Sequence, residues 1–124
     1  MRTLILALML LASTTQAEPQ RMTAAEIEPL LTGNTAVGEW RGRWYRQLFR
    51  ADGSTIYAEK GRRSALGEWR VNSETDDFES LWPGGAWEPF GVARIDGGLF
   101  WLEVGREPAH FEMIEGEALV WAED

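Results

Sequence analysis

The sequence predicts a mainly β protein in which about eight short antiparallel strands form a small up-and-down barrel, preceded by a short N-terminal helix. Turn residues interrupt the chain from Glu39 onward at intervals of roughly 8 to 12 residues, which is typical of an antiparallel meander, sandwich or barrel. Every connection between the expected strands is short, so the helical crossovers of a parallel sheet have no room. Closing the sheet on itself removes exposed strand edges, which favours the barrel over the alternative, a β-sandwich.

The N-terminus has the layout of a secretory signal peptide. A basic start is followed by an apolar stretch, Leu4–Ala12, and by a small residue at Ala17. The apolar stretch is too short to cross a bilayer as a helix, which needs about twenty residues. We therefore expect cleavage after Ala17, a single β domain over residues 18–124, and a periplasmic or secreted protein without a permanent membrane anchor.

A short helix is expected to start at Ala24. Thr23 and Glu26 have the spacing of a capping box, in which each side chain satisfies a backbone donor of the other. Gly33 can end the helix in a left-handed conformation, and Pro29 argues against a long regular helix. The apolar face of this helix consists of Ile27, Leu30 and Leu31.

The strands are read from the apolar and aromatic segments between turn signals. The first strand region is Trp40–Arg50, and the hairpin turn Ala51–Ser54 follows it, because Asp-Gly tolerates positive φ. The remaining strands are expected at Thr55–Glu59, Ala65–Val71, Phe78–Trp82, Trp87–Ile95, Leu99–Val104, His110–Ile114 and Ala118–Ala122. Several of these are apolar on both faces, so their register is not fixed by the pattern.

Composition decides how such a barrel is stabilised. The chain has no cysteine, which excludes disulfides and thiolate chemistry, and burial of its seven tryptophans, five phenylalanines and two tyrosines must supply the stability. The interior of an eight-stranded barrel is either filled by side chains or holds one small ligand. Both arrangements are open at this point.

Charge is distributed unevenly along an acidic chain with a formal net charge of −8. Residues 41–70 hold eight basic and three acidic side chains, whereas residues 71–124 hold two basic and thirteen acidic ones. Such a split indicates either strands of opposite charge sharing a solvated surface or a basic face that binds an anionic ligand or partner. Nucleic acid is not an expected partner for an exported acidic protein.

A candidate ligand site comes from the segment Trp40–Phe49, which interleaves aromatic residues with arginines. This pattern binds anions or flat groups in some proteins, and in others it reflects one aromatic face packing inward while arginine stems cover the outside. If a ligand site exists, we expect it at the barrel mouth, formed by Trp44, Arg46, Trp69 and Arg94.

Catalytic and metal chemistry find little support in the sequence. His110 is the only histidine, and Glu112 lies two residues on, so a surface histidine beside an acid is the simpler interpretation. One histidine without cysteine does not supply the ligands of a conventional zinc site. Asp76, Asp77 and Glu79 form the densest acidic group, and they fall at an expected turn, where solvation explains them. We predict no catalytic residue, metal or cofactor.

Several segments together resemble a known family. They are the helix end LTGNT (Leu31–Thr35), YRQLF followed by ADGST (Tyr45–Thr55), GEWRV (Gly67–Val71) and PFGVAR (Pro89–Arg94). Over roughly Thr23–Arg94 the chain resembles a family of small secreted bacterial domains of unknown function, found mainly in proteobacteria. The resemblance implies a periplasmic or secreted location and a calycin-like or otherwise compact β fold, and it implies no activity.

Three functions are compatible with these observations. The favoured one is a non-enzymatic exported module that binds a small molecule or an envelope component. The first alternative is an inhibitor of a secreted hydrolase such as lysozyme, with the acidic C-terminal half meeting a basic enzyme. The second is an enzyme that uses carboxylates and His110. Acids or His110 beside a polar cavity would favour this enzyme, and a packed apolar interior would exclude it.

Overall fold

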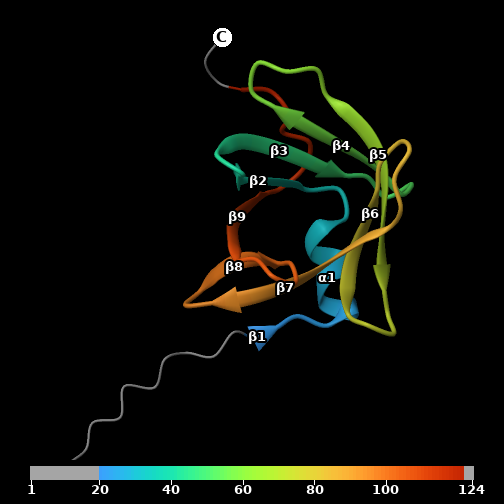
Figure 1. The fold of residues 1–124 in the computed structure, drawn as a ribbon, viewed down its shortest axis with the longest axis vertical. Helices are drawn as coiled ribbons and strands as arrows, with labels where there is room; N and C mark the ends of the chain where they lie inside the picture. Colours follow the sequence, from blue (N-terminus) through green and yellow to red (C-terminus); the bar gives the residue numbers. More distant parts are fainter. Residues whose placement is uncertain (1–19, 122–124) are drawn as a thin grey trace, which may run out of the picture.

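The computed structural model describes residues 20–121, so the predicted signal peptide of residues 1–17 lies outside the described residues. One short helix and nine strands follow in chain order (Figure 1). They are β1 (Gln20–Arg21), α1 (Ala24–Leu31), β2 (Thr35–Trp40), β3 (Arg43–Phe49), β4 (Ser54–Glu59), β5 (Ala65–Asn72), β6 (Asp77–Leu81), β7 (Glu88–Ile95), β8 (Gly98–Leu102) and β9 (Ala109–Ile114).

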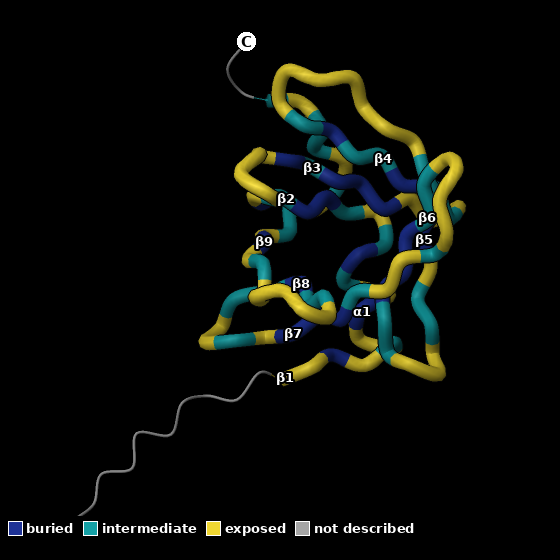
Figure 2. The backbone as a smooth tube through the Cα atoms, viewed as in Figure 1, coloured by how far each residue is buried: buried dark blue, intermediate teal, exposed yellow. Residues whose placement is uncertain are grey.

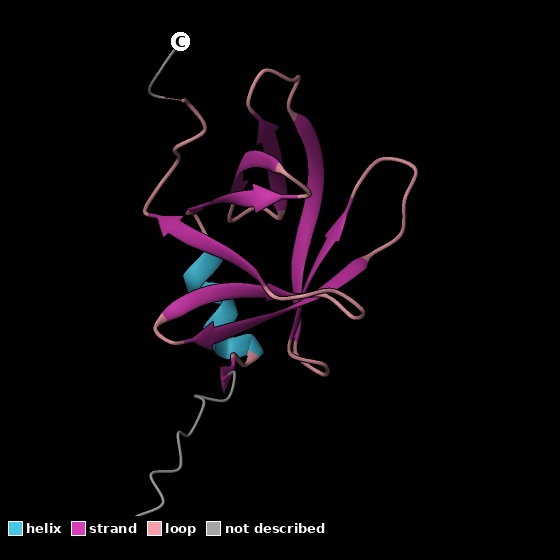
Figure 3. Ribbon diagram, turned by 60° about the vertical axis from the view of Figure 1, so that its left-hand side comes forward, coloured by secondary structure: helices cyan, strands magenta, loops and turns pink. Residues whose placement is uncertain are grey.

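The predicted up-and-down barrel is confirmed. Each strand from β2 to β9 pairs antiparallel with the next one in the chain, and β9 returns to pair with β2, which closes the eight-stranded barrel. The extra strand β1 lies along β7, with Arg21 opposite Ala93. Figure 3 shows the strands curving around a common interior, with α1 beside them. The β-sandwich alternative does not describe this sheet, because it is one continuous closed surface.

Helix α1 begins at Ala24, as predicted. The Glu26 carboxylate accepts hydrogen bonds from the backbone N–H of Thr23 at 3.2 Å and from its hydroxyl at 3.0 Å. These bonds lower the pKa of Glu26, since they favour the charged carboxylate. Asp76, in the β5–β6 turn, accepts the Ala24 N–H at 2.8 Å and ties the helix start to the sheet. Gly33 follows the helix with φ +78°, as expected of a left-handed helix end.

The helix closes one end of the barrel, and we call this the closed end. Its Ile27 and Leu31 are fully buried, and α1 contacts β5 and β6. The strand interiors above it are filled by aromatic rings, with Phe49 in edge contact with Trp69 at 5.6 Å and Phe78 at 5.4 Å between ring centroids. Buried residues line the strands near α1 (Figure 2). The opposite end carries the β2–β3 turn and the β4–β5 loop, and we call it the open end.

The strand β2 was missed in the sequence, where the first strand region starts at Trp40. The structure places a two-residue turn there, at Arg41 with φ +51° and Gly42 with φ +80°, and β2 precedes it. Two residues with positive φ make the tight hairpin turn that matches the twist of antiparallel strands. Arginine is not a residue that this turn usually selects, so the turn left no recognisable signal.

The predicted strand Ala118–Ala122 is wrong for its described part. Residues 118–121 form no strand and instead pack outside the barrel along the start of β2. The Ala118 N–H donates to Thr35 Oγ1 at 3.0 Å, the Thr35 hydroxyl donates to the Gly116 carbonyl at 2.7 Å, and the Asn34 side-chain carbonyl accepts the Gly116 N–H at 3.0 Å. We call these three bonds the seam latch. The side chains of Asn34 and Thr35 therefore bind the backbone of this segment, which forms no strand-to-strand ladder.

Candidate ligand-binding site

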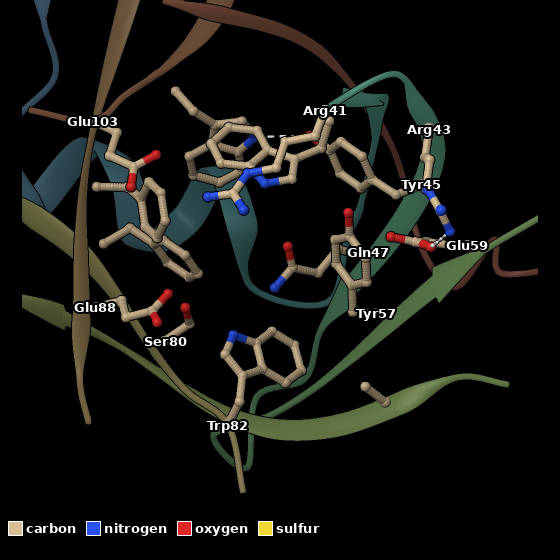
Figure 4. Close-up of a pocket in the computed structure, with 15 residues that line it drawn as sticks. Arg41, Arg43, Tyr45, Gln47, Tyr57, Glu59, Ser80, Trp82, Glu88 and Glu103 are labelled. Atoms are coloured by element: carbon tan, nitrogen blue, oxygen red, sulfur yellow. Dashed lines mark hydrogen bonds and ion pairs between the residues drawn. The ribbon is translucent and has the colours of Figure 1, made fainter. Parts of the chain in front are cut away.

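The open end contains a cavity of about 430 Å³. It is lined by side chains from every barrel strand except β9, together with residues that follow β2, β6 and β8 (Figure 4). Its volume lies within the roughly 300 to 1,000 Å³ typical of small-molecule sites. At the closed end, the interior is occupied by the rings of Phe49, Trp69 and Phe78, which contact one another. The barrel is thus filled in one half and hollow in the other.

Strand alternation decides which residues reach the cavity. On β3, Arg43, Tyr45 and Gln47 line the cavity, and the residues between them point outward. The register carries this pattern across the sheet, because Tyr45 lies opposite Glu59 and Gln47 opposite Tyr57, and paired residues share a face. The inward face of β3 and β4 at the open end is therefore mixed in polarity.

Aromatic rings form two walls of the cavity. Tyr45 stacks on Tyr57 with ring centroids 5.1 Å apart, and Trp82 meets Tyr57 edge-on at 6.0 Å. A second contact joins Trp40 and Phe90 at 5.9 Å. Both arrangements are those that aromatic pairs prefer. Flat surfaces on two sides suit a ligand that stacks.

A glycine makes space for one of these rings. A Cβ atom built on Gly67 would lie 2.6 Å from the Trp82 ring, closer than real Cβ atoms approach a neighbour. The missing side chain on β5 lets the indole lie flat against the strand. The position of Trp82 in the cavity wall thus depends on a residue of the neighbouring strand.

The two stacked tyrosines differ in their hydrogen bonds. Trp101 Nε1 donates to the Tyr45 hydroxyl at 2.9 Å, whereas the buried Tyr57 hydroxyl has no hydrogen-bond partner within residues 20–121. Burial raises the pKa of Tyr45 to about 12 and raises that of Tyr57 as well, where the nearby Glu59 charge adds to the effect. Both hydroxyls carry their protons at neutral pH, so the buried Tyr57 hydroxyl is a donor whose hydrogen bond is unmade among residues 20–121.

Five charged side chains line the cavity: Arg41, Arg43, Glu59, Glu88 and Glu103. Arg43 and Arg62 each lie 3.5 Å from the Glu59 carboxylate. Glu103 lies 3.2 Å from Arg106 without hydrogen-bond geometry, so that contact is purely electrostatic. Arg41 and Glu88 form no ion pair with any side chain in the described part of the chain.

Two of the predicted site residues, Trp44 and Arg46, lie on the outer face of β3. Trp44 has 57% of its surface exposed. Arg46 donates to the Ala118 carbonyl at 2.7 Å, and its guanidinium lies 4.7 Å from the centre of the Trp121 ring. The arginine therefore holds the C-terminal segment on the outside of the barrel. The prediction that it projects into the barrel mouth is wrong.

The other two predicted residues lie away from the cavity as well. Trp69 points inward, but it is buried in the core and donates through Nε1 to the Arg50 carbonyl at 2.8 Å. Arg94 is exposed on β7, opposite Gln20 of β1. The structure does not bring Trp44, Arg46, Trp69 and Arg94 together. A strand register was needed to choose the inward residues, and the sequence pattern did not fix it.

Groups considered for catalysis or metal binding lie outside the cavity. His110 is exposed and packs against the Phe100 ring, with centroids 5.2 Å apart. The acidic group at the β5–β6 turn has structural partners: Asp76 caps α1, Asp77 pairs with Arg21, and Glu79 pairs with Arg70. Among residues 20–121, no three His, Asp or Glu side chains are grouped so that they could hold a metal ion. Within the same range, no helix is long and apolar enough to span a membrane.

Comparison of the chain with protein-family models, curated proteins and solved structures found no match. The resemblance to a family of small secreted domains therefore stays a prediction. A fold by itself does not specify a function, so the cavity has to carry the argument.

Proposed function

We propose that this protein is an exported, non-enzymatic binding module that holds a small organic molecule in the open end of its barrel. The cavity carries the proposal, because an eight-stranded barrel has only enough interior for side chains or for one small ligand. Here the closed end is filled and the open end keeps about 430 Å³ free. The signal-peptide pattern of residues 1–17 supports export to the periplasm or beyond.

The lining of the cavity supports an organic ligand over water or a bare ion. Aromatic side chains supply large contact areas, and a few polar groups fix the orientation of a ligand, as in most small-molecule sites. The Tyr57 hydroxyl is one such group, since it is buried and has no partner among the described residues. A buried donor without a partner costs about 1–3 kcal/mol, and a ligand acceptor would remove that cost.

A carboxylate-dependent enzyme is the second candidate, because three carboxylates line the cavity. Glu59 and Glu103 are held in ion pairs with arginines, which leaves Glu88 as the acid without such a partner among residues 20–121. Hydrolysis between two carboxylates requires one to act as acid and the other as base or nucleophile. The observed pairing therefore favours binding.

The test is to fill the cavity without disturbing the core. Ala65 lines the cavity and is exposed at its rim, so Ala65→Trp should block the cavity and preserve folding. Leu66→Trp is the matched control, because Leu66 is the next residue of β5 and is 62% exposed on the outer face. We expect wild type and Leu66→Trp to bind 1-anilinonaphthalene-8-sulfonate, measured by its fluorescence, and Ala65→Trp to bind about tenfold more weakly.

Native mass spectrometry adds a second measurement. The same three proteins are produced in the organism that makes the wild type and purified without organic solvent. A small molecule that accompanies wild type and Leu66→Trp and is absent from Ala65→Trp would support the proposal. Equal dye binding by all three proteins, with no accompanying molecule in any of them, would contradict it.

A further inference from the structure

We infer that the ligand of this cavity is a flat, dipolar molecule, with an anionic group at one end and a positively charged hydrogen-bond donor at the other. Arg41 would bind the anionic end, and Glu88 would bind the donor. The inference rests on the proposed function and specifies the chemistry of its ligand. It starts from the two charged side chains of the cavity that have no ion-pair partner within residues 20–121.

Arg41 is held over the cavity by an unusual backbone conformation. It is the first residue of the β2–β3 turn and has φ +51°, a value that favours glycine, asparagine or aspartate. Such a conformation strains a residue that has a side chain, and strain of this type is often found at ligand sites. Figure 4 shows the Arg41 side chain extending from the turn into the cavity. The turn thus places a guanidinium at a position whose backbone conformation glycine or asparagine would adopt more easily.

The guanidinium of Arg41 is suited to a carboxylate. Its planar fork of N–H donors matches the two oxygens of such a group. The other arginine of the lining, Arg43, already faces Glu59 at 3.5 Å, and Glu59 also faces Arg62. Among residues 20–121, Arg41 is therefore the cation of the lining that has no ion pair and can bind an anionic end.

Glu88 approaches the cavity from a different wall. It lies on β7 directly opposite Ser80 of β6, and the Ser80 side chain is buried. In Figure 4 the Glu88 carboxylate and the Ser80 hydroxyl lie side by side, with Glu103 on the same side of the cavity. Three acceptor groups together favour a positively charged donor at this end.

The charges of the whole lining favour a dipolar ligand over ligands of a single sign. A purely anionic molecule in the cavity meets Glu59, Glu88 and Glu103, and a purely cationic one meets Arg41 and Arg43. Like charges within about 6 Å repel, and this repulsion grows where water is excluded. A molecule with opposite charges at its two ends places each beside its complement.

The aromatic side chains of the cavity determine the shape of the ligand between its two charged ends. The stacked pair of Tyr45 and Tyr57 and the edge-on pair of Trp40 and Phe90 both belong to the cavity lining. A ring would stack on such side chains, and aromatic faces also attract a cationic group. The structure thus points to an aromatic ring between the charged ends.

Four probes test this inference. They share one benzene ring and differ in whether each of its two para positions carries a charged group or a methyl group. They are 4-(aminomethyl)benzoate, which carries both charges, 4-methylbenzoate, 4-methylbenzylamine and neutral p-xylene. Isothermal titration calorimetry of the wild-type protein should give the tightest binding for 4-(aminomethyl)benzoate. We expect about tenfold weaker binding, or about 1.4 kcal/mol, for each singly charged probe, because it forms only one of the two charged hydrogen bonds.

Two variants that each remove one charge test which residue binds which end of the ligand. Arg41→Gln should weaken 4-(aminomethyl)benzoate and 4-methylbenzoate about tenfold and leave 4-methylbenzylamine unchanged. Glu88→Gln should weaken 4-(aminomethyl)benzoate and 4-methylbenzylamine and leave 4-methylbenzoate unchanged. The matched controls are Arg94→Gln and Glu68→Gln, because both residues are exposed on strands outside the cavity, and neither should change binding.

The outcomes separate this inference from the proposed function. If a singly charged probe binds wild type as tightly as 4-(aminomethyl)benzoate, or if no probe binds while dye binding still depends on Ala65, the dipolar ligand is excluded and the binding module stands. If the controls weaken binding as much as Arg41→Gln and Glu88→Gln, the assignment of the two ends is overturned. Loss of both probe binding and Ala65-dependent dye binding would remove the proposed function itself.

Discussion

The closed and open ends of the barrel are built by the same strands, yet their interiors differ. Inward residues of β3 run from Arg43 through Tyr45 and Gln47 to Phe49, from charged at the open end to fully buried at the closed end. Strand β7 shows the same gradient from Glu88 to the fully buried Val92. A single alternating pattern thus encodes both a core and a cavity.

This gradient separates stability from binding. The helix and the aromatic rings of the closed end bury the apolar surface that keeps the chain folded. The charged side chains Arg41, Arg43 and Glu88 of the open end are exposed, so changes to them cost less burial. Substitutions at the two ends should therefore have different effects, and the following predictions test that difference from the largest expected effect to the smallest.

The largest effect is expected at the centre of the closed end. Phe49→Ala removes a fully buried ring that contacts Trp69, Phe78 and Trp101, and it should lower the free energy of unfolding by about 3–5 kcal/mol. Urea denaturation followed by tryptophan fluorescence measures the loss. The control is Trp44→Ala on the outer face of the same strand, with an expected change within about 0.5 kcal/mol. Similar losses in the two variants would contradict the assignment of the core to this end.

A smaller effect should distinguish the two stacked tyrosines. Tyr45→Phe leaves the buried Trp101 Nε1–H without its acceptor and should cost about 1–3 kcal/mol of unfolding free energy. Tyr57→Phe removes a buried hydroxyl that has no partner among residues 20–121, so it should not lower the free energy of unfolding and should raise it by up to about 1–3 kcal/mol.

The two variants Tyr45→Phe and Tyr57→Phe separate stability from binding more clearly when ligand binding is measured as well. Tyr57→Phe should weaken the dye or probe binding described above while its urea midpoint does not fall. A Tyr57→Phe protein as destabilised as Tyr45→Phe would mean that the Tyr57 hydroxyl has a structural role.

The smallest effect concerns pH and the start of α1. The pKa of Glu26 is lowered by the Thr23 backbone N–H and hydroxyl, so its contribution to stability is present above its unfolded pKa and is lost as pH falls through its folded pKa. Between pH 7 and pH 3 the wild type should therefore lose slightly more stability than Glu26→Gln. Thermal unfolding at both pH values, with Glu28→Gln as the control from the same helix, measures the difference. An identical pH dependence in wild type and Glu26→Gln would exclude this role.

The architecture was largely predictable because turn chemistry is local. Asp52-Gly53, the helix start at Ala24 and the glycine after the helix all have the predicted roles. Residues that break their local rule were missed: Arg41 makes a turn that glycine or asparagine would have announced. One missed strand and one strand too many gave the expected number of barrel strands, so that agreement is partly fortuitous.

The site was less predictable because it depends on register and on distant segments. Trp44 and Tyr45 are neighbours in the chain and point to opposite faces, and their exposure in the closed barrel, 57% against 2%, shows that Tyr45 is the inward one. Trp82 reaches the cavity wall because Gly67 on another strand has no side chain. Neither relation is visible in a local pattern of residues.

The seam latch has a consequence for how the barrel forms. All other neighbouring strands of the barrel are joined by short turns or loops, whereas β2 and β9 meet across the whole meander, and Thr35 binds Gly116 from 81 residues away. Contacts between distant residues require the largest loop to close, so folding should zip along the hairpins and join this pair last. The bonds of Asn34 and Thr35 to the C-terminal segment then stabilise the pairing of β2 with β9, which no short turn brings together. Removal of residues 116–121 would therefore mainly speed unfolding, because this contact forms late, even though the removal takes away no strand.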